Sequence, residues 1–424
     1  MFKTFIEVET FFKKRSEFGI KPGLERIHSL LDKAGNPEKK MKAVHVAGTN
    51  GKGSTASFLI DGLVANGYKT GFFTSPSFSG LTGHIYINKE PISEGAFISL
   101  LNQLLPAIEL LDEQDMHPTE FEIITVLAIM HLAEQAEISV IETGMGGRFD
   151  TTNCFEPILS IITNVSIDHA SFLGSTVVDI AEHKAGIIKH NRPVIAGEMK
   201  DEAFAVIREE ATGKSAPIFH IGEEFQYRKT WPDSFIWTSG GKSYDVKLGM
   251  SGVHQMHNAS LAIAGFALLD EEGVLIDMEK AVKALAETAV PGRFEKVHSN
   301  PDIILDGAHN PDGIRSFTKT AKAFAEGKSS KVVFSAFRDK DISSMLEQLK
   351  EEFNHIVLVP FDHPRALSIE EEKKLAEKYN LELKTDWHSV VDEMIEEKEA
   401  SCMFITGSLN FILRVREYIL SKHD

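Results

Sequence analysis

A glycine-rich turn near the N-terminus constrains the fold of this chain more than any other stretch. Residues 44–54 read V-H-V-A-G-T-N-G-K-G-S, with a short β-branched run before the turn and a helical pattern over 55–65 after it. In a strand–turn–helix unit, glycines let backbone N–H groups approach a phosphate, and the helix N-terminus adds partial positive charge. The turn therefore predicts a phosphate-binding loop, with a solvated surface loop as the alternative for so short a motif.

Composition narrows the class of protein. A hydrophobic content of 42% and a charged content of 25% are typical of a soluble globular chain. The formal net charge of −17 argues against a nucleic-acid partner or an anionic membrane surface. Two distant cysteines, Cys154 and Cys402, suit a reducing compartment, and no apolar run reaches the length of a membrane span. We expect a cytoplasmic protein.

The first part of the chain has the pattern of a mostly parallel sheet. Helices are expected over 5–34 with a break at Pro22-Gly23, and over 95–111, 120–133, 176–187 and 254–269; strands are expected over 70–74, 138–141, 158–162 and 193–196, with an edge strand at 85–87 and short strands within 217–250. Polar clusters at 142–153 and 163–169 follow two of these strands. Because ligands lie beyond the carboxyl ends of parallel strands, we expect both clusters to meet the glycine-rich turn, although either alone could be an ordinary turn.

The pattern restarts after 290–295. Strands are expected over 302–305, 331–335, 355–359 and 402–406, and helices over 312–325, 341–350, 369–378, 388–396 and 409–420. This alternation is typical of an independent α/β domain. We therefore predict two domains, covering residues 1–290 and 295–424.

Nine motifs in order resemble one family. They are G-T-N-G-K-G-S (48–54), T-S-P (74–76), E-T-G-M-G-G-R-F-D-T-T-N (142–153), I-T-N-V-S-I-D-H (162–169), A-G-I-I-K (185–189), H-Q-M-H-N-A (254–259), P-G-R-F-E (291–295), D-G-A-H-N-P (306–311) and T-G-S-L (406–409). Their order and spacing resemble the folylpolyglutamate synthase / dihydrofolate synthase family of Mur-type ligases. The resemblance implies a P-loop ATPase domain with a mostly parallel sheet, followed by a C-terminal Rossmann-like α/β domain.

The resemblance also implies a reaction. It would be a Mg-ATP-dependent amide ligation that adds L-glutamate to a reduced folate such as tetrahydrofolate, or also to dihydropteroate, through an acyl phosphate. Phosphoryl transfer depends mainly on positioning and charge neutralisation, so cations and backbone donors matter more than a nucleophilic side chain. The expected partners are these small molecules, and we expect a monomer.

The family's site residues carry over position by position. The resemblance implies phosphate contacts from Thr49, Asn50, Gly51, Lys52, Gly53 and Ser54, and further nucleotide contacts from Asn258, Arg293, Asp306 and His309. Two Mg²⁺ ions are implied, with Ser54, Ser75 and Glu142 as ligands of the first, and His169 and a carbamylated Lys184 as ligands of the second. Lys52, His169, Lys184 and Arg293 would be catalytic, and Phe121, Asp150 and Ser408 would contact substrate.

Residues 77–85 depart from the family pattern. They read S-F-S-G-L-T-G-H-I, so that Gly83 and His84 stand where the family has Glu and Arg, and the arginine holds the acidic amino acid. Imidazole does not replace a bidentate guanidinium. His183 likewise stands where the family usually has Glu. These departures leave open a paralogous ligase with a different acid or amine. A non-catalytic nucleotide-binding protein ranks last because the expected metal ligands are present.

Overall fold

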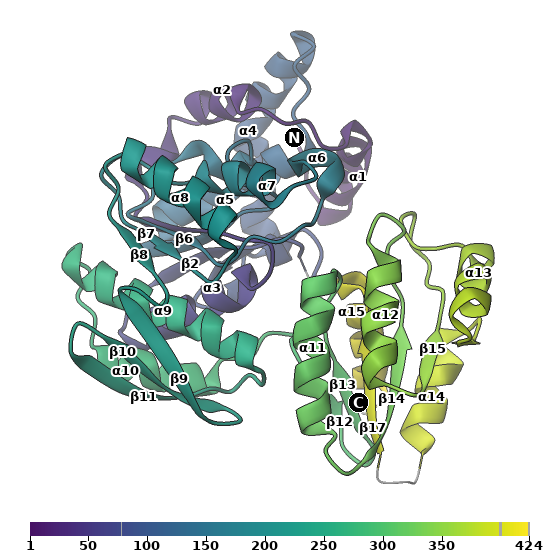
Figure 1. Cartoon of the computed structure of the whole chain (residues 1–424). Helices are drawn as coiled ribbons and strands as arrows, with labels where there is room; N and C mark the ends of the chain where they lie inside the picture. The colour runs from purple at the N-terminus through teal and green to yellow at the C-terminus, as the bar shows by residue number, and fades with distance from the viewer. Residues whose placement is uncertain (78, 398–400, 423–424) are drawn as a thin grey trace. The chain divides into compact units, whose positions relative to one another are not determined.

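The chain folds into two compact units in the computed structural model, which describes residues 1–77, 79–397 and 401–422 (Figure 1). The first unit comprises Met1–Thr230, Phe235–Lys247 and His257–Thr288, and the second comprises Trp231–Ser234, Leu248–Met256 and Ala289–Asp424. The domain division at 290–295 stays a prediction. The sequence patterns did not indicate the two short segments that group with the second unit.

An eight-stranded sheet forms the centre of the first unit, in the order β4-β3-β2-β5-β1-β6-β7-β8. Its strands are β1 (Ala43–Ala47), β2 (Thr70–Phe73), β3 (Ile85–Ile87), β4 (Glu90–Pro91), β5 (Ile138–Glu142), β6 (Leu159–Ile162), β7 (Val194–Ala196) and β8 (Ile218–His220). From β2 to β8 all neighbours are parallel, whereas β3 is antiparallel to β2 and to β4. The mostly parallel sheet is confirmed. The edge position expected for 85–87 is wrong, because β4 pairs outside it.

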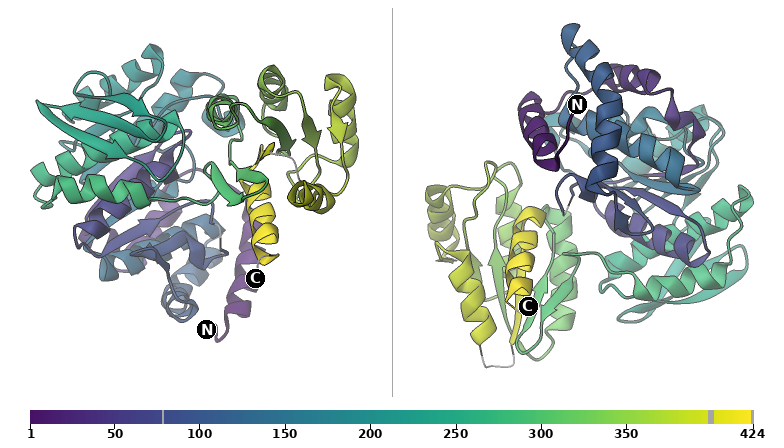
Figure 2. Two further views of the ribbon diagram at one scale, coloured as in Figure 1. Left: turned by 90° about the horizontal axis from the view of Figure 1, so that it is seen from below. Right: turned by 180° about the vertical axis from the view of Figure 1, so that it is seen from behind.

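Helices cover both faces of this sheet. They are α1 (Phe5–Arg15), α2 (Glu25–Lys33), α3 (Lys52–Ala65), α4 (Glu94–Glu113), α5 (Glu120–Gln135), α6 (Ala170–Leu173), α7 (Val177–Ala185), α8 (Asp201–Gly213), α9 (Val253–Glu271) and α10 (Met278–Ala284). Figures 1 and 2 show α5, α7 and α8 on one face and α3 with α9 on the other. Among these, α6, α8 and α10 were not predicted. The expected break in 5–34 is confirmed by the gap between α1 and α2.

Helix α3 starts three residues earlier than the pattern predicted. Gly51 precedes it with φ +84°, so Lys52, Gly53 and Ser54 form its first turn. The helix is then packed closely against α9, because a Cβ added at Gly62 would lie 2.1 Å from the ring of Phe266. The N–H groups of a first helical turn have no partner within the helix, so the G-K-G-S segment itself supplies the donors for an anion.

A small antiparallel sheet, in the order β11-β10-β9, accounts for most of the short strands expected within 217–250. It consists of β9 (Phe225–Trp231), β10 (Ser234–Ser239) and β11 (Lys242–Lys247). Gly240 and Gly241 join the last two strands with φ of +53° and +79°. Two successive positive φ values are those of a type I′ hairpin turn, which glycine adopts without steric cost.

The second unit is a six-stranded sheet between two helical layers, in the order β12-β13-β17-β14-β15-β16 (Figure 1). Its strands are β12 (Glu295–His298), β13 (Asp302–Leu305), β14 (Ser329–Phe334), β15 (Ile356–Leu358), β16 (Glu382–Leu383) and β17 (Ser401–Thr406); its helices are α11 (Pro311–Phe324), α12 (Ile342–Glu352), α13 (Ile369–Tyr379), α14 (Trp387–Glu396) and α15 (Leu409–Ser421). Alternate residues of β13 face opposite cores: Ile304 packs with Phe317 of α11, and Ile303 with Phe411 of α15. The predicted alternation is confirmed, with β12 and β16 as unpredicted edge strands.

No helix within the described part of the chain combines the length and the apolarity that crossing a bilayer would require.

Candidate active site

The polar segments singled out in the sequence meet at one edge of the first unit's sheet. Strands β2, β5, β1 and β6 are consecutive neighbours and run parallel. Their carboxyl ends therefore deliver Ser75, Glu142, the turn 48–54 and the segment 163–169 to the same edge. This convergence confirms the expectation from the strand pattern.

The glycine-rich turn is held by the segment that follows β6. Asn164 Oδ1 accepts hydrogen bonds from the backbone N–H of Thr49 at 3.1 Å and of Asn50 at 2.9 Å. The Thr163 hydroxyl donates to Asn50 O at 2.6 Å, and Thr49 Oγ1 exchanges two 3.0 Å bonds with the backbone of Ser166. Asn164 lies in the I-T-N-V-S-I-D-H motif, but neither the residue pattern nor the family resemblance predicts this support for the turn. Because Asn164 occupies two N–H donors of the turn, it shapes the loop rather than contacting phosphate through them.

Lys52 and Asn258 both lie against the turn. Lys52 Nζ donates to the carbonyl oxygens of Gly48 at 3.1 Å and Thr49 at 3.4 Å, so its ammonium is held at the mouth of the loop. A Cβ added at Gly51 would be 2.3 Å from Asn258 Oδ1. Asn258 of α9 thus lies beside the backbone that precedes α3, and its nucleotide contact stays a prediction.

Glu142 lies at the end of β5 beside the first turn of α3. It is 5% exposed, and its Oε2 accepts a 2.5 Å hydrogen bond from the Thr74 hydroxyl. A Cβ added at Gly53 would contact the same oxygen at 3.5 Å. Buried Ser54, the Ser75 hydroxyl and this carboxylate are hard oxygen donors of the kind Mg²⁺ prefers.

The donor set also fits an ion that keeps water ligands. Across residues 1–77, 79–397 and 401–422, no three side chains of His, Cys, Asp and Glu gather as a preformed metal cluster. Two hydroxyls and one carboxylate would leave the remaining Mg²⁺ positions to water and to phosphate oxygens. The residues present therefore fit a nucleotide-bound Mg²⁺.

Lys184 is a buried lysine on α7 whose pKa is strongly lowered. Its side chain is 2% exposed, and burial, reinforced by the charge of Lys52, lowers its pKa to about 7 against the opposing influence of Asp168 and Asp150. A substantial fraction of the amine is therefore neutral near neutral pH. His169 has φ +52°, and its backbone N–H donates to Asp168 Oδ1 at 2.8 Å. Asp168 belongs to the I-T-N-V-S-I-D-H motif, and the sequence alone predicts no site role for it.

Asp150 and Phe121 organise the loop after β5. Asp150 accepts hydrogen bonds from the N–H groups of Met145 at 2.7 Å and Thr152 at 3.0 Å, and from the Thr152 hydroxyl, which in turn receives His45 Nε2–H at 2.9 Å. Burial raises the pKa of Asp150. Phe121 packs on Phe73 with ring centroids 5.8 Å apart. The carboxylate therefore has a structural task in the loop, and its substrate role stays a prediction.

The loop 77–85, whose sequence departs from the family pattern, packs through small residues. A Cβ at Gly83 would lie 2.5 Å from the hydroxyls of both Ser77 and Ser79, so the serine-rich segment lies close over this glycine. His84 Nδ1 bonds Thr74 O at 2.7 Å, and burial lowers the pKa of its imidazole. Phe78 lies outside the described residues. A neutral imidazole engaged by a carbonyl is not an equivalent of the family's arginine.

The candidate residues of the second unit also meet at the carboxyl ends of its strands. Asp306 follows β13 and accepts from the N–H groups of Phe294 at 3.0 Å and Ala308 at 2.9 Å. Burial raises its pKa to about 6, partly offset by Arg293, whose guanidinium would lie 2.9 Å from a Cβ at Gly307. His309 Nδ1 bonds Gly307 O at 2.9 Å. Arg293, Asp306 and His309 thus form one cluster.

Ser408 has a capping position in the second unit. It precedes α15, and its buried hydroxyl accepts from the N–H of Phe411 at 3.5 Å. The neighbouring Gly407 N–H donates to Ala308 O at 3.0 Å, which joins the T-G-S-L and D-G-A-H-N-P motifs. The predicted substrate contact of Ser408 stays a prediction.

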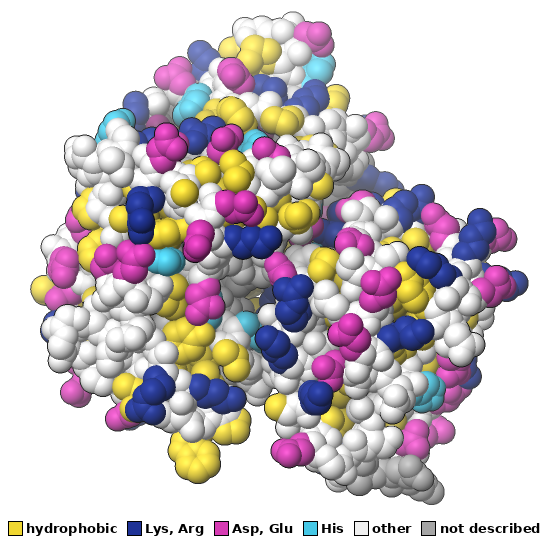
Figure 3. Space-filling view, viewed as in Figure 1, with side chains coloured by type: hydrophobic (Ala, Val, Ile, Leu, Met, Phe, Trp, Pro, Cys, Tyr) yellow, Lys and Arg dark blue, Asp and Glu magenta, His cyan; other side chains and the backbone are white. Residues whose placement is uncertain are grey.

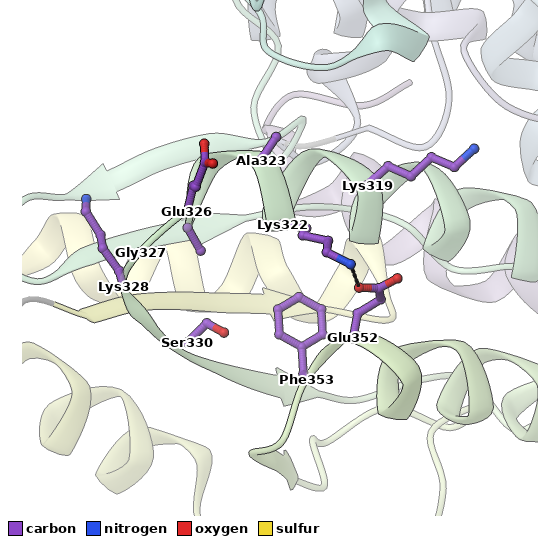
Figure 4. Close-up of a pocket in the computed structure, with 10 residues that line it drawn as sticks. Lys319, Lys322, Ala323, Glu326, Gly327, Lys328, Ser330, Glu352 and Phe353 are labelled. Carbon is purple, nitrogen blue, oxygen red and sulfur yellow. Dashed lines mark hydrogen bonds and ion pairs between the residues drawn. The ribbon is translucent and has the colours of Figure 1, made fainter.

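A hollow in the second unit lies at the opposite end of its sheet. It measures about 530 Å³ and is bordered by Lys322, Lys328, Ser330 and Glu352, near the start of β14 (Figure 4). Lys322 pairs with Glu352 at 2.7 Å, and Lys328 with Asp302 at 2.9 Å. Figure 3 shows acidic and basic side chains interspersed over this face of the unit. Paired charges at the amino ends of parallel strands do not make this hollow a candidate for the reaction site.

Known proteins resemble the chain over nearly its whole length. The Mur ligase middle domain matches residues 46–266, and the Mur ligase glutamate ligase domain matches residues 292–409. The dihydrofolate synthase/folylpolyglutamate synthase of Bacillus subtilis is 38% identical, with 98% of this chain and 99% of the relative covered.

Two solved structures match with equal TM-scores. Escherichia coli FolC in complex with DHPP and ADP has a TM-score of 0.88 at 26% identity, with 98% of each chain covered. The folylpolyglutamate synthase of Mycobacterium tuberculosis complexed with ADP and AMPPCP also has a TM-score of 0.88, at 28% identity and with 98% of each chain covered.

Proposed function

The chain belongs to the folylpolyglutamate synthase/dihydrofolate synthase family, an ATP-dependent ligase family that joins glutamate to folates or dihydropteroate, and we propose how its residues carry out that reaction. The observation that carries the proposal is the shared sheet edge at which Lys52, Ser75, Glu142 and the turn 48–54 meet. We propose that ATP phosphorylates a free carboxylate of the pterin substrate, which is the pteroate carboxylate of dihydropteroate or a glutamate carboxylate of tetrahydrofolate, and that the amine of L-glutamate then displaces phosphate.

The residues of the first unit divide the task of holding the triphosphate. The first turn of α3 offers backbone N–H donors, and Lys52 offers a positive charge already held by two loop carbonyls. Mg²⁺ bound by Ser54, Ser75 and Glu142 would neutralise charge on the phosphate oxygens. Asn258, packed beside Gly51, is assigned to the adenine. Positioning and neutralised charge are the main contributions a protein makes to phosphoryl transfer.

Lys184 is assigned to a second Mg²⁺ as a carbamate, together with His169. The reaction is Lys–NH₂ + CO₂ → Lys–NH–COO⁻ + H⁺, and it needs the neutral amine. A lysine that is 2% exposed, with its pKa lowered to about 7, supplies that amine far more readily than an ordinary lysine. The product is an oxygen ligand in place of an ammonium that would repel the ion.

The finer assignments follow the family's motifs. Arg293, Asp306 and His309 are assigned to the nucleotide, and Phe121, Asp150 and Ser408 to the substrates. We place the enzyme in the cytoplasm, because its two cysteines, Cys154 and Cys402, are free and buried. Tetrahydrofolate and dihydropteroate are both proposed acceptors, with L-glutamate as the amine.

A substrate panel tests the proposed function. ADP release is measured with tetrahydrofolate, dihydropteroate and several amino acids, singly and in pairs. We expect ADP only when a pterin acid and L-glutamate are both present. Release that requires a different acid or a different amine would make the chain a ligase of other specificity and would overturn the substrate assignment.

A rescue experiment tests the carbamate. Lys184→Ala should lose activity, and short carboxylic acids should restore part of it by supplying the missing oxygen ligand. Lys189→Ala, which removes a partly buried lysine whose Nζ donates to Asn153 O at 3.4 Å, is the matched control and should gain nothing from added acid. Full activity of Lys184→Ala without acid would remove the carbamate from the mechanism.

A further inference from the structure

His84 and Thr74 form a reciprocal pair at the point where β2 and β3 separate. The antiparallel register of these strands ends with Phe73 opposite Ile85, so Thr74 and His84 are the next opposed residues. The Thr74 N–H donates to His84 O at 3.1 Å, and His84 Nδ1 lies 2.7 Å from Thr74 O. Because a carbonyl oxygen only accepts, Nδ1 carries the proton. The pair thus ties Thr74 through both its N–H and its carbonyl.

Thr74 connects this pair to the proposed metal ligands. Its hydroxyl donates to Glu142 Oε2 at 2.5 Å, and the residue that follows it is Ser75. Thr74 is 7% exposed, so its carbonyl would be costly to leave without a partner. A change in the backbone of Thr74 would move both the hydroxyl that orients Glu142 and the start of the Ser75 turn.

The geometry disfavours the alternative role of His84 as a stand-in for the family's arginine. An arginine holds a carboxylate with two parallel N–H donors. With Nδ1 committed to Thr74 O, the imidazole has a single ring nitrogen left and cannot form such a fork. Its ring also lies 6.1 Å from that of Phe73, which places it against the end of β2.

We propose that His84 is a positioning residue of the metal site, which acts through Thr74 to fix the Glu142 carboxylate and the Ser75 turn, and which does not bind the glutamate substrate. The proposal rests on the proposed function in one respect, the assignment of Ser75 and Glu142 to Mg²⁺. The proposal explains why Gly83 and His84 replace the family's Glu and Arg. Gly83 leaves room for the hydroxyls of Ser77 and Ser79, and His84 holds the end of β2 through its hydrogen bond to Thr74 O. Hydrogen-bond partners of metal ligands commonly alter metal affinity by about 10- to 100-fold when removed.

Mn²⁺ binding to the ADP-loaded enzyme tests the proposal. Mn²⁺ replaces Mg²⁺ as a paramagnetic probe, and free Mn²⁺ is measured by electron paramagnetic resonance. His84→Phe keeps a ring beside Phe73 but has no donor, whereas His84→Asn keeps an N–H near the position of Nδ1. We expect His84→Phe to weaken Mn²⁺ binding by about tenfold, and His84→Asn to restore most of that loss. His131→Phe, a half-buried histidine on α5, is the matched control and should bind Mn²⁺ as the wild type does.

A second pair of variants covers the case in which His84→Phe fails to fold. Thr74→Val removes only the hydroxyl that reaches Glu142, and Thr74→Ser keeps it. The expected result is again about tenfold weaker Mn²⁺ binding for the valine variant, with recovery in the serine variant. Unchanged Mn²⁺ affinity in the donor-free variants, with a raised KM for L-glutamate in His84→Phe, would overturn the proposal and make His84 a substrate contact. Failure of the wild type with ADP to bind Mn²⁺ would instead overturn the metal assignment itself.

Discussion

Two strand-to-helix turns, one in each unit, hold the candidate residues in opposite ways. The turn 48–54 joins β1 to α3, and its last residue before the helix is Gly51, which has no side chain to cap α3. The turn 306–310 joins β13 to α11, and there Asn310 caps the helix through Gly313 N–H at 2.8 Å. No side chain caps the start of α3, whose N–H groups are proposed to bind an anion, whereas the side chain of Asn310 caps the start of α11.

The supports of the two turns differ accordingly. The turn 48–54 is held by Asn164, which lies in the segment after the neighbouring strand β6. Asn164 accepts from the N–H groups of Thr49 and Asn50, and not from those of the first turn of α3, which are proposed to bind phosphate. The turn 306–310 is held by its own Asp306, whose carboxylate accepts from the N–H groups of Phe294 and Ala308, and also by Gly407, whose N–H donates to Ala308 O. The clearest difference is therefore at the helix start, where Asn310 caps α11 with its side chain and Gly51 has no side chain to cap α3.

The largest effect should come from removing the cation of the first turn. Lys52→Ala is expected to lower kcat by about 10³-fold, because it deletes charge stabilisation of the transferred phosphoryl group. The rate of ADP release at saturating substrate concentrations measures this kcat. Lys319→Ala, an exposed lysine on α11, should retain the wild-type rate. A normal kcat in Lys52→Ala would mean that the turn is not the phosphate loop.

The external support of the first turn should be nearly as important. Asn164→Ala leaves the N–H groups of Thr49 and Asn50 without their acceptor, and we expect ADP affinity to fall by about 10- to 100-fold as the loop loses its shape. Calorimetric titration with ADP measures this. Asn66→Ala is the control: Asn66 makes two comparable bonds, to Gly62 and Asp277, at the other end of α3. Equal ADP affinity in the two variants would contradict the role of Asn164.

The internal support of the second turn should appear in the pH dependence of stability. The pKa of Asp306 is raised by burial to about 6 in the folded chain, so the folded state favours the protonated carboxyl. Its contribution to the free energy of unfolding is complete below its ordinary pKa and is lost as pH rises through about 6. Relative to Asp306→Asn, the wild type should lose on the order of 2 kcal/mol between pH 4 and 7.

Denaturant titrations over that pH range measure the difference, and Asp302 supplies a control that should stay constant over it. Hydrogen bonds from Lys296 and Lys328 lower the pKa of Asp302, so its contribution to the free energy of unfolding is present above its ordinary pKa and is lost only as pH falls through the lowered pKa. A constant difference between wild type and Asp306→Asn from pH 4 to 7 would show that the carboxyl titrates normally.

The smallest effect should come from removing the side-chain cap at the start of α11. Asn310→Ala removes the cap of α11 and is expected to lower the free energy of unfolding by about 1 kcal/mol. Asp341→Ala removes the equivalent cap of α12 and should cost a similar amount. A much larger loss at Asn310 would show that this residue supports more of the turn than the helix start.

The sequence was a good guide where a pattern is local. Short continuous apolar runs located the parallel strands, and their polar ends indicated that the turn 48–54 and the cluster at 142–153 would meet, since a parallel sheet brings all carboxyl ends to one edge. The metal role of Glu142 and the nucleotide role of Asp306 come from the family resemblance. The apolar pattern starts the helix at residue 55, and glycines such as those at 51 and 53 have low intrinsic helix propensity. The structure nevertheless uses Gly53 within the first turn.

Other features could not be read from local patterns because they depend on partners distant in the chain. Asn164 is more than a hundred residues from the N–H groups it accepts, and only the adjacency of β1 and β6 brings them together. Thr74 and Glu142 meet for the same reason across β2 and β5. The strands β12 and β16 are 4 and 2 residues long, too short to show an apolar period. The helix α8 was not predicted, although Ala203, Phe204, Ile207 and Ala211 have the spacing of a buried helix face.

The close packing of α3 on α9 has a consequence for nucleotide binding. Phe266 lies where Gly62 would carry a side chain, and Asn258, nearer the start of α9, lies against Gly51 at the head of α3. The distance between the turn 48–54 and Asn258 is therefore set by the packing of the two helices. The proposed phosphate and adenine contacts would then be in place before a nucleotide binds, without a movement of one helix along the other.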